Sequence, residues 1–580
     1  MRRIWNMPVR TRVSWIDVAV AVFVFALLFV IIKLGTGMGV PLSPKDQPHI
    51  VLDWRMLPYY AGRSLLRMFI AYACSLLFTF IYGRIAALNK TAEKVMIPLL
   101  DILQSVPVLG FLSVTVTGFM ALFPHSLLGA ECASIFAIFT GQVWNMTFSF
   151  YASVASLPRE LNEAAKVMRF DAFTRFTRLE LPFAMIGLVW NSMMSFGGGW
   201  FFLAASESIT VLNQNIQLPG LGSYMATAMN RGDIPALIEA IVTMVLVIIL
   251  VDQLFWRPIV AWSQKFKMEL SNAGDQPTSW FLNLLRRSAL AQWIGRQVFG
   301  ALGRAIDRAM LHLAKRAQAR GPRLRPAPVR RGLKWILLAA AAAVVAYYGY
   351  LGVVEVSRLG WRDILHVVVL GCFTALRVFA STALALLWTI PVGVAIGSNQ
   401  RASQIAQPVV QILASFPANM FFPFIALMYL NWHVNFELGA IPLMMLGTQW
   451  YILFNVIAGT MAIPNDLKEA TKVLGLRGWE RWKRLYLPAI FPYVVNGCVT
   501  ASGGAWNASI IAELVSWHKH TLVAAGLGAY ITEATTRGSW PNIVLSIVAM
   551  AVFVTIINRF LWRPLYSFAE SRYRIEWSGR

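Results

Sequence analysis

Four ionisable residues interrupt long apolar runs of the sequence and are the first candidates for a functional role. They form one pair in each half of the chain, Arg67 with Glu207 and Arg377 with Glu513. Charged groups within spanning apolar segments are costly, so they are functional candidates by default. We expect all four at a similar depth near the outer ends of their helices, with each Arg paired to a Glu of the same or the opposite half.

A polar, basic segment that occurs twice is the second candidate. Residues 157–182 read LPRELNEAAKVMRFDAFTRFTRLELP, and residues 463–488 read IPNDLKEATKVLGLRGWERWKRLYLP. Aromatic or leucine residues recur at every third position late in each copy (170, 173, 176 and 179; 476, 479, 482 and 485). This spacing predicts a short helix with one apolar face. Such a face could enter a groove of a partner, pack on the protein's own helices, or lie in lipid headgroups.

Patterns typical of catalytic or metal sites do not occur in the sequence. There is no H-E-x-x-H pair, no cluster of His or Cys with ligand spacing, and no G-x-x-x-x-G-K-[ST] phosphate-binding loop. The four cysteines, at positions 74, 132, 372 and 498, lie in or beside apolar runs and are predicted to be small buried hydrophobes. We therefore expect no catalytic residue, no metal site and no cofactor in this chain.

The composition is that of an integral membrane protein. Of the 580 residues, 57% are hydrophobic and 13% are charged, against about 25% charged residues in soluble proteins. We predict about twelve spanning helices, near 15–35, 62–83, 96–121, 130–152, 183–206, 236–256, 332–353, 371–396, 405–430, 437–461, 488–512 and 541–562. The net charge of +24 is explained by basic cytoplasmic loops and termini, so we expect a lipid bilayer, and not nucleic acid, as the partner.

The duplication extends well beyond the basic segment. Trp144 pairs with Trp450, and the sequence Trp-Arg-Pro at 256–258 pairs with the same sequence at 562–564, each 306 residues later. Nearer the start of each half the separation is 310 residues, as for Arg67 and Arg377. Six helices per half give both halves the same orientation, which predicts two parallel six-helix repeats. Positive-inside counting places both termini in the cytoplasm.

Three domains follow from this repeat. Residues 1–258 form the first repeat, residues 259–331 a basic cytoplasmic connector, and residues 332–580 the second repeat. Within the connector, apolar residues at 298, 302, 306 and 310 alternate with arginines. This pattern is typical of an amphipathic helix on a membrane surface, or of a solvated tether with some helix.

Two interpretations of the Arg and Glu pairs stay open. They could belong to an outer gate, next to the glycine-rich stretches 197–199 and 503–504, where backbones can approach closely or bend. Alternatively, they are structural ion pairs that order the bundle. An unpaired Arg facing a pathway would suit an anion, and a neutralising Glu removes that inference.

The duplicated segment resembles the EAA loop of membrane subunits in binding-protein-dependent ABC importers. The first copy carries Glu163, Ala164, Ala165, Leu181 and Pro182, and the second carries Glu469, Ala470, Thr471, Gly475, Leu487 and Pro488. The flanking sequence, notably VDQLFWRP at 251–258, is most similar to the nitrate, sulfonate and taurine permease branch. The resemblance covers about 62–258 and 372–564.

This resemblance implies a fold like that of type I ABC importers and a role as the fused permease subunit of an ATP-driven importer in the bacterial inner membrane. It implies that both EAA segments dock into separate ABC ATP-binding subunits, two in all, which bind ATP and Mg. It also implies a periplasmic substrate-binding protein and a small solute of the nitrate, sulfonate, taurine or bicarbonate class.

The sequence departs from the family pattern at two places. Arg169 stands at the usual Gly position of the first copy, where a positive φ would strain any larger residue, and Thr471 replaces the second Ala of the other copy. We therefore expect the two docking segments to differ in shape, affinity or coupling.

Two rival functions remain. A secondary transporter can also have two parallel six-helix halves, and it would be driven by an ion gradient and not by ATP. An intramembrane enzyme would need a convergent acid, base or metal cluster. The sequence does not identify the solute.

Overall fold

The structure is a computed structural model of the 580-residue chain. It describes residues 32–39, 49–124, 126–168, 170–211, 214–266, 279–294 and 349–573, with isolated residues between 15 and 22, at 297 and between 339 and 347. The predicted spans near 15–35 and 332–353 lie largely outside the described residues. The predicted amphipathic helix of the connector lies outside them as well.

The first half is built from helices and one small hairpin. In chain order these are α2 (Leu57–Phe78), α3 (Arg84–Leu88), α4 (Lys90–Ser105), α5 (Leu112–Leu122), α6 (Leu128–Ala155), α7 (Arg159–Val167), α8 (Ala172–Arg175), α9 (Leu181–Ser206), β1 (Ser208–Val211), β2 (Gln214–Gln217), α10 (Leu221–Arg231), α11 (Ile234–Val251) and α12 (Arg257–Ser263). Two short helices of the connector follow, α13 (Trp280–Arg287) and α14 (Ala289–Ile294).

The second half repeats this order. Its elements are α17 (Trp361–Ser398), α18 (Gln400–Ser415), α19 (Phe422–Asn431), α20 (Phe436–Met461), α21 (Asn465–Val473), α22 (Gly478–Arg481), α23 (Leu487–Ala512), β3 (Leu514–Trp517), β4 (His520–Val523), α24 (Leu527–Arg537), α25 (Trp540–Ile557) and α26 (Arg563–Tyr573).

The all-α membrane fold is confirmed. Seven helical segments of the described part are long and apolar enough to span a membrane, or eight if one bent pair counts as a span. The seven are Trp54–Leu88, Ala172–Ser206, Ile234–Phe266, Trp361–Ser398, Phe436–Met461, Gly478–Ala512 and Trp540–Arg572. Between 28% and 50% of the residues in each apolar window are buried inside the protein, and the exposed remainder is suited to contact with lipid.

The two predicted helices near 96–121 and 405–430 are each broken, which corrects the expectation of continuous spans. A proline disfavours helical geometry in the residue before it and lacks an N–H. Val106 and Phe416, which precede Pro107 and Pro417, accordingly have extended ψ angles of 120° and 128°. In the second half the two arms of the break meet at 73°.

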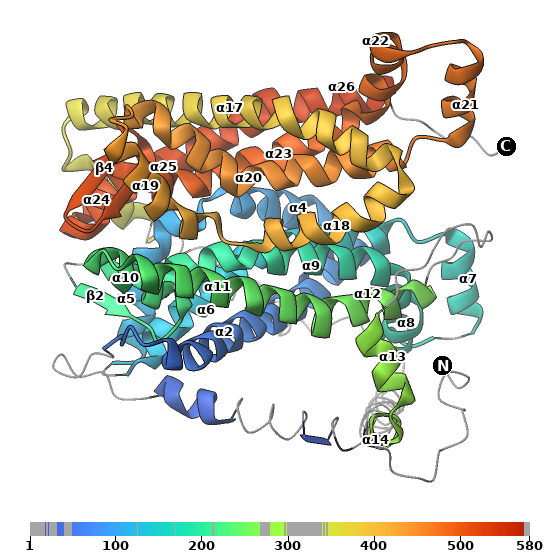
Figure 1. The fold of residues 1–580 in the computed structure, drawn as a ribbon, viewed down its shortest axis with the longest axis horizontal. Helices are drawn as coiled ribbons and strands as arrows, with labels where there is room; N and C mark the ends of the chain where they lie inside the picture. The colour runs from blue at the N-terminus through green and yellow to red at the C-terminus, as the bar shows by residue number, and fades with distance from the viewer. Residues whose placement is uncertain are drawn as a thin grey trace.

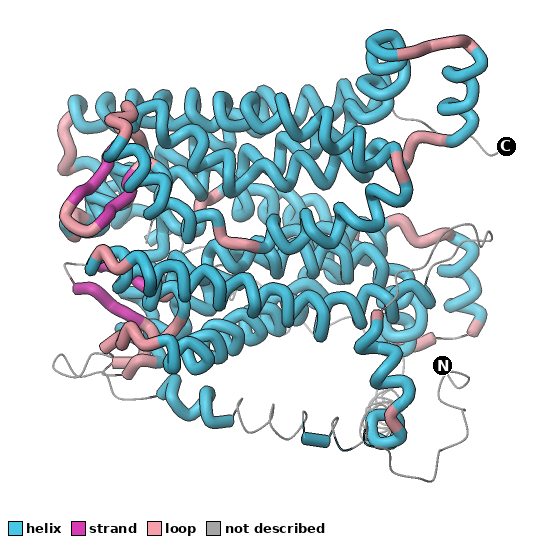
Figure 2. Tube along the Cα trace, viewed as in Figure 1, coloured by secondary structure: helices cyan, strands magenta, loops and turns pink. Residues whose placement is uncertain are grey.

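The halves lie side by side as two layers of roughly parallel helices (Figure 1). Helices α7 and α8 of the first half and α21 and α22 of the second project at one end of the bundle, here called the loop end. Both hairpins lie at the opposite end, the hairpin end, where Figure 2 shows the strands in magenta. Both halves therefore run in the same direction through the bundle, as parallel repeats require.

The hairpins were not predicted. Strands β1 and β2 pair antiparallel with Ser208 opposite Gln217, and β3 and β4 pair with Leu514 opposite Val523. Each has only four residues per strand, which is too short for a clear alternating pattern. Each hairpin joins the end of a long spanning helix to a short helix, α10 or α24, and so turns the chain back at this end.

Candidate functional site

The hairpin end holds a cluster of buried ion pairs in the first half. Arg67 lies between two carboxylates: its Nη1 donates to Glu207 Oε1 at 2.6 Å, and its Nε donates to Glu131 Oε2 at 2.5 Å. Arg63 forms a further ion pair with Glu131. All four side chains are completely buried. Two positive and two negative charges therefore balance one another inside the protein.

Glu207 also caps the N-terminus of α10. Its Oε2 accepts a hydrogen bond from the Gly222 backbone N–H at 2.7 Å, and its Oε1 accepts one from the Ser64 hydroxyl at 2.6 Å. A Cβ at Gly220 would lie 2.3 Å from this carboxylate, so only glycine leaves room for it. A carboxylate at a helix N-terminus is stabilised by free N–H groups and the helix dipole. The ion cluster thus ties α2, α9 and α10 together.

The second half repeats this arrangement with one cation fewer. Arg377 Nη1 donates to Glu513 Oε1 at 3.0 Å, and Arg377 also pairs with Glu437. Thr374 and the Gly528 N–H donate to Glu513, each at 2.8 Å. The Glu437 side chain is 47% exposed, whereas Glu513 is fully buried.

Sequence reasoning missed Arg63, Glu131 and Glu437. The repeat could have revealed the two carboxylates, because positions 131 and 437 are separated by the same 306 residues as the other pairs. Arg63 has no counterpart to reveal it, since the position 310 residues later is Phe373.

Each Arg pairs with a Glu of its own half. Because carboxylates neutralise Arg67 and Arg377, neither arginine is free to attract an anion. A role for these pairs in a gate stays a prediction.

The EAA segments form short helices that project at the loop end. Helices α7 and α21 expose Glu163 and Glu469, and both end in uncovered apolar side chains. The exposed fractions are 84% for Val167, 88% for Val473 and 72% for Leu474. Apolar side chains exposed at this level, next to charged ones, are suited to contact with another protein.

The Ala positions of the motif have two different environments. Ala164 and Ala470 are exposed, whereas Ala165 and Thr471 are buried against the body of the loop. The Thr471 hydroxyl donates to the carbonyl of Lys468 at 2.8 Å. Thr therefore fits the second Ala position without leaving a buried donor unpaired.

The aromatic face of each segment packs mainly on the protein itself. Phe176 contacts the rings of Phe80 and Phe150, with centroids 5.5 and 6.3 Å away. Trp482 packs against the second-half core, whereas Trp479 is 70% exposed. The exposed apolar surface is thus provided chiefly by the ends of α7 and α21.

Leu181–Pro182 and Leu487–Pro488 mark the start of the long helices α9 and α23, and these residues are partly buried. Proline lacks the N–H that would continue the α-helical ladder. The preceding Leu181 N–H bonds to the carbonyl of Phe176, five residues back, and so closes one π-helical turn. The second copy has the same turn at Trp482–Tyr486. Loop and spanning helix are therefore joined by continuous helical backbone.

Gly475 has a φ of +67°, a left-handed conformation that favours glycine. After it, the Leu476 N–H bonds at 3.0 Å to the carbonyl five residues earlier. The Phe170 N–H makes the corresponding bond at 2.9 Å in the first copy. Arg169, which precedes Phe170, lies outside the described residues.

Asp171 caps α8. The Thr174 hydroxyl donates to its carboxylate, and the Phe173 backbone N–H donates to it at 3.2 Å. These hydrogen bonds hold the pKa of Asp171 below its usual value.

The two loops are anchored to the bundle by different chemistry. In the first half, buried Glu180 pairs with Arg84 at 2.7 Å and with Arg175 at 2.9 Å. The corresponding positions of Glu180 and Arg84 in the second half are Tyr486 and Val394, both buried in one apolar cluster. At these positions the first loop is therefore held by ion pairs, in addition to the packing of Phe176, and the second by apolar packing.

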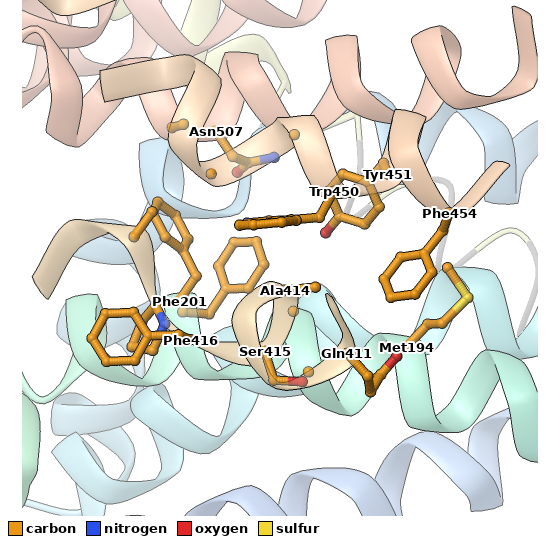
Figure 3. A pocket seen from close by; sticks show the side chains of 18 residues that line it. Met194, Phe201, Gln411, Ala414, Ser415, Phe416, Trp450, Tyr451, Phe454 and Asn507 are labelled. Carbon is orange, nitrogen blue, oxygen red and sulfur yellow. The ribbon is translucent and has the colours of Figure 1, made fainter. Parts of the chain in front are cut away.

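A cavity of about 70 Å³ lies between the two halves (Figure 3). It is lined by Met194, Gly197, Gly198, Phe201, Phe202, Gln411, Ala414, Ser415, Phe416, Pro417, Ala418, Gly447, Trp450, Tyr451, Phe454, Gly504, Asn507 and Ala508. These residues come from α9 and from the broken helix, α20 and α23 of the second half. Because one water molecule needs roughly 10–15 Å³ of such cavity volume, the cavity has room for a small solute.

Glycines bring the halves together at this cavity. A Cβ at Gly197 would lie 2.7 Å from Ser415 Oγ, and one at Gly198 would lie 3.2 Å from the Tyr451 hydroxyl. The glycine-rich stretch therefore permits the close approach that its sequence indicates. Across the same interface, the Val108 backbone N–H donates to Asn507 Oδ1 at 2.7 Å.

The cavity lining contains neutral polar groups and aromatic rings, and no Asp, Glu, Lys, Arg or His is among the described residues that form it. Nor do the described residues contain a group of three or more His, Cys, Asp or Glu side chains placed to hold a metal ion.

The sequence profile of one protein family matches the chain twice, over residues 79–255 and 389–566, which is more than half of the chain. Its description is "Binding-protein-dependent transport system inner membrane component".

Individual relatives match about one third of the chain. The nitrate import permease protein NrtB of Leptolyngbya laminosa is 26% identical over 182 residues, which are 31% of this chain and 62% of that protein. The bicarbonate transport system permease protein CmpB of Synechococcus elongatus is 26% identical over 185 residues, 32% of this chain and 63% of that protein. A probable ABC transporter permease protein of Brucella melitensis is 27% identical over 232 residues, 39% and 87% of the two chains. The chain thus spans about three fifths of the length of the NrtB and CmpB relatives.

Proposed function

Because the chain belongs to the family of inner membrane components of binding-protein-dependent transport systems, we propose that it forms the complete translocation pathway of an ATP-driven importer for a small anion. The family assignment makes it a multi-pass membrane permease, which is a transport subunit. The observation that carries the finer proposal is the pair of EAA segments, which project from the same end of two equivalent halves (Figure 1).

Two ABC ATP-binding subunits would bind at the loop end, one on each segment. The exposed apolar ends of α7 and α21, flanked by Glu163 and Glu469, would enter a cleft on each subunit. ATP and Mg would be bound there, since this sequence has no phosphate-binding loop of its own. The loop end would then face the cytoplasm, and a periplasmic substrate-binding protein would meet the hairpin end.

The placement of the cavity between the halves supports alternating access as the mechanism. Movement of the ATP-binding subunits would reach α9 and α23 through the continuous helical turns before Pro182 and Pro488. Tilting of the halves would open the cavity first to the hairpin end and then to the loop end.

A small anion is the proposed solute because relatives are named for nitrate and bicarbonate. The cavity has room for a solute of that size.

A pull-down from native membranes in mild detergent tests this proposal. Wild type should recover ATP-binding subunits, Glu163→Arg and Glu469→Arg should each recover less, and the double variant should recover none. Reversal of both charges acts only on exposed side chains, so the permease itself should stay folded. Uptake that follows an ion gradient, with no ATPase recovered by wild type, would instead identify a secondary transporter.

A further inference from the structure

We propose that the cavity between the halves is a selectivity site for a singly charged anion, in which Asn507 and Tyr451 donate the hydrogen bonds that select it. This inference rests on the proposed function and adds the residues and the charge that determine specificity.

Asn507 has its acceptor engaged and its donors available. Its Oδ1 accepts the Val108 backbone N–H at 2.7 Å, which fixes the orientation of the amide. Its Nδ2 makes only a long contact, at 3.4 Å, with the carbonyl of Gly503. Since Asn507 lines the cavity, its amide can offer N–H groups there, while its oxygen already accepts one hydrogen bond. A site that offers donors suits an anion.

Tyr451 provides a second donor from the neighbouring helix α20. Its hydroxyl lies close to the backbone of Gly198, where an added Cβ would be 3.2 Å away. Figure 3 shows its ring beside Trp450 at the cavity, with Gln411 and Ser415 on the opposite wall. A phenol hydroxyl, an indole N–H, a serine hydroxyl and a primary amide can all donate hydrogen bonds.

No charged side chain is among the described residues that line the cavity, and this limits the charge of the anion that can bind there. The buried Arg67 and Arg377 add no free positive charge, because each is paired with carboxylates at the hairpin end. The Born cost of removing an ion from water grows with the square of its charge, about fourfold for a dianion over a monoanion of equal size. Neutral donors can offset the smaller cost, and they would leave a dianion such as sulfate strongly disfavoured.

The donors come almost entirely from the second half. The first half contributes Met194, Phe201 and Phe202 together with two glycines. Equivalent positions of the two repeats carry different residue types, since Phe201 corresponds to Asn507 and Asn145 corresponds to Tyr451. The chain thus forms a single polar site from one half, facing an apolar wall from the other.

The test uses the full complex of permease, ATP-binding subunits and binding protein in proteoliposomes, with nitrate as the probe. Asn507→Asp is the decisive variant. It retains the oxygen that accepts the Val108 N–H and replaces the donors by a negative charge. We expect nitrate uptake to fall about 100-fold, with ATPase recovery unchanged, and to recover as the pH is lowered and the new carboxyl becomes protonated. Tyr451→Phe should lower uptake about 10-fold, which is typical for loss of one hydrogen bond to a charged group.

Asn542→Asp is the matched control. It makes the same change in the first turn of α25, where a negative charge is tolerated, and it should alter uptake less than about 2-fold. Sulfate should compete poorly with nitrate in wild type. Choline is the opposing probe, because aromatic rings also attract organic cations.

Nitrate uptake by Asn507→Asp that stays within about 2-fold of wild type would overturn the selectivity site and leave the importer function intact. So would equal competition by sulfate, or transport of choline and not nitrate. Failure of the proposed function would appear separately, as wild-type uptake that does not require ATP or as loss of the ATP-binding subunits from the complex.

Discussion

Replacement of Arg67 should strongly destabilise the first half. It is fully buried between Glu131 and Glu207, so Arg67→Met would leave buried carboxylates without their main cation. Breaking a buried ion pair in this way costs roughly 3–5 kcal/mol. We predict a clear drop in the thermal unfolding midpoint in detergent. Arg377→Met should have a smaller effect, because its partner Glu437 is half exposed, and equal midpoints for the two variants would contradict this.

The carboxylates give a test of the gate hypothesis. Glu207→Gln and Glu513→Gln keep the shape of the side chain and the acceptor for the Gly222 or Gly528 N–H, while removing the charge that pairs with Arg. If the pairs form a gate, transport should lose its coupling to ATP hydrolysis, which a comparison of uptake and ATPase rates would measure. Unchanged coupling in both variants would leave these pairs a structural role only.

Gly475 should be needed for the shape of the second docking segment. Its φ of +67° costs a residue with a Cβ about 1–2 kcal/mol, although open space surrounds the position. Gly475→Ala should therefore weaken recovery of the ATP-binding subunits while the unfolding midpoint of the bundle stays constant. Gly503→Ala, at a glycine that also has open space but no positive φ, is the control and should bind as wild type does.

At the scale of elements, the two docking segments should respond differently to loss of charge. Glu180→Gln removes the carboxylate that anchors α8 through Arg84 and Arg175. The second segment depends on the apolar packing of Tyr486. We predict faster tryptic cleavage within residues 159–178 of the variant, with cleavage within residues 477–484 unchanged. Equal acceleration in both segments would show that the anchors are coupled.

Hydropathy predicted where most spanning elements lie and could not predict how two of them bend. Residues 96–121 and 405–430 are continuously apolar enough to suggest one helix each, and prolines also occur inside intact helices such as α17 and α20. What distinguishes Pro107 and Pro417 is the extended backbone that precedes each of them. Both prolines are compatible with that extended geometry, but a proline in the sequence does not by itself indicate where a helix breaks.

At the scale of the whole molecule, the hairpin of the second half reaches across to the first. The His518 N–H donates to the Met229 carbonyl at 3.1 Å, and its ring Nδ1 lies 3.2 Å from the Asn230 carbonyl. If the halves separate at the hairpin end, a disulfide between Asn230→Cys and His518→Cys, with the four native cysteines replaced, should stop uptake. Reductant should restore it. Uptake that continues in the cross-linked protein would show that this contact does not open.

The repeat and its direction could be predicted from the sequence, because paired residues are separated by 310 residues near the start of each half and by 306 residues after that. The cavity could not, because its lining residues lie between positions 194 and 508 and meet only when two layers pack. The duplicated glycines indicated part of this contact, because Gly197 and Gly198 lie where the halves approach closely. The repeat did not reveal Asn507, because its equivalent in the first half is Phe201.

The one-sided cavity has a consequence for how such a molecule can evolve. In an assembly of two identical chains, every change at the axis appears twice, so a donor gained on one side is gained on the other. A single continuous chain with two halves escapes that constraint: Asn507 and Phe201 occupy equivalent positions with opposite polarity. Linking the halves also raises the effective concentration of each unlike half near the other, which favours their pairing over a twofold copy with a doubled or an empty site.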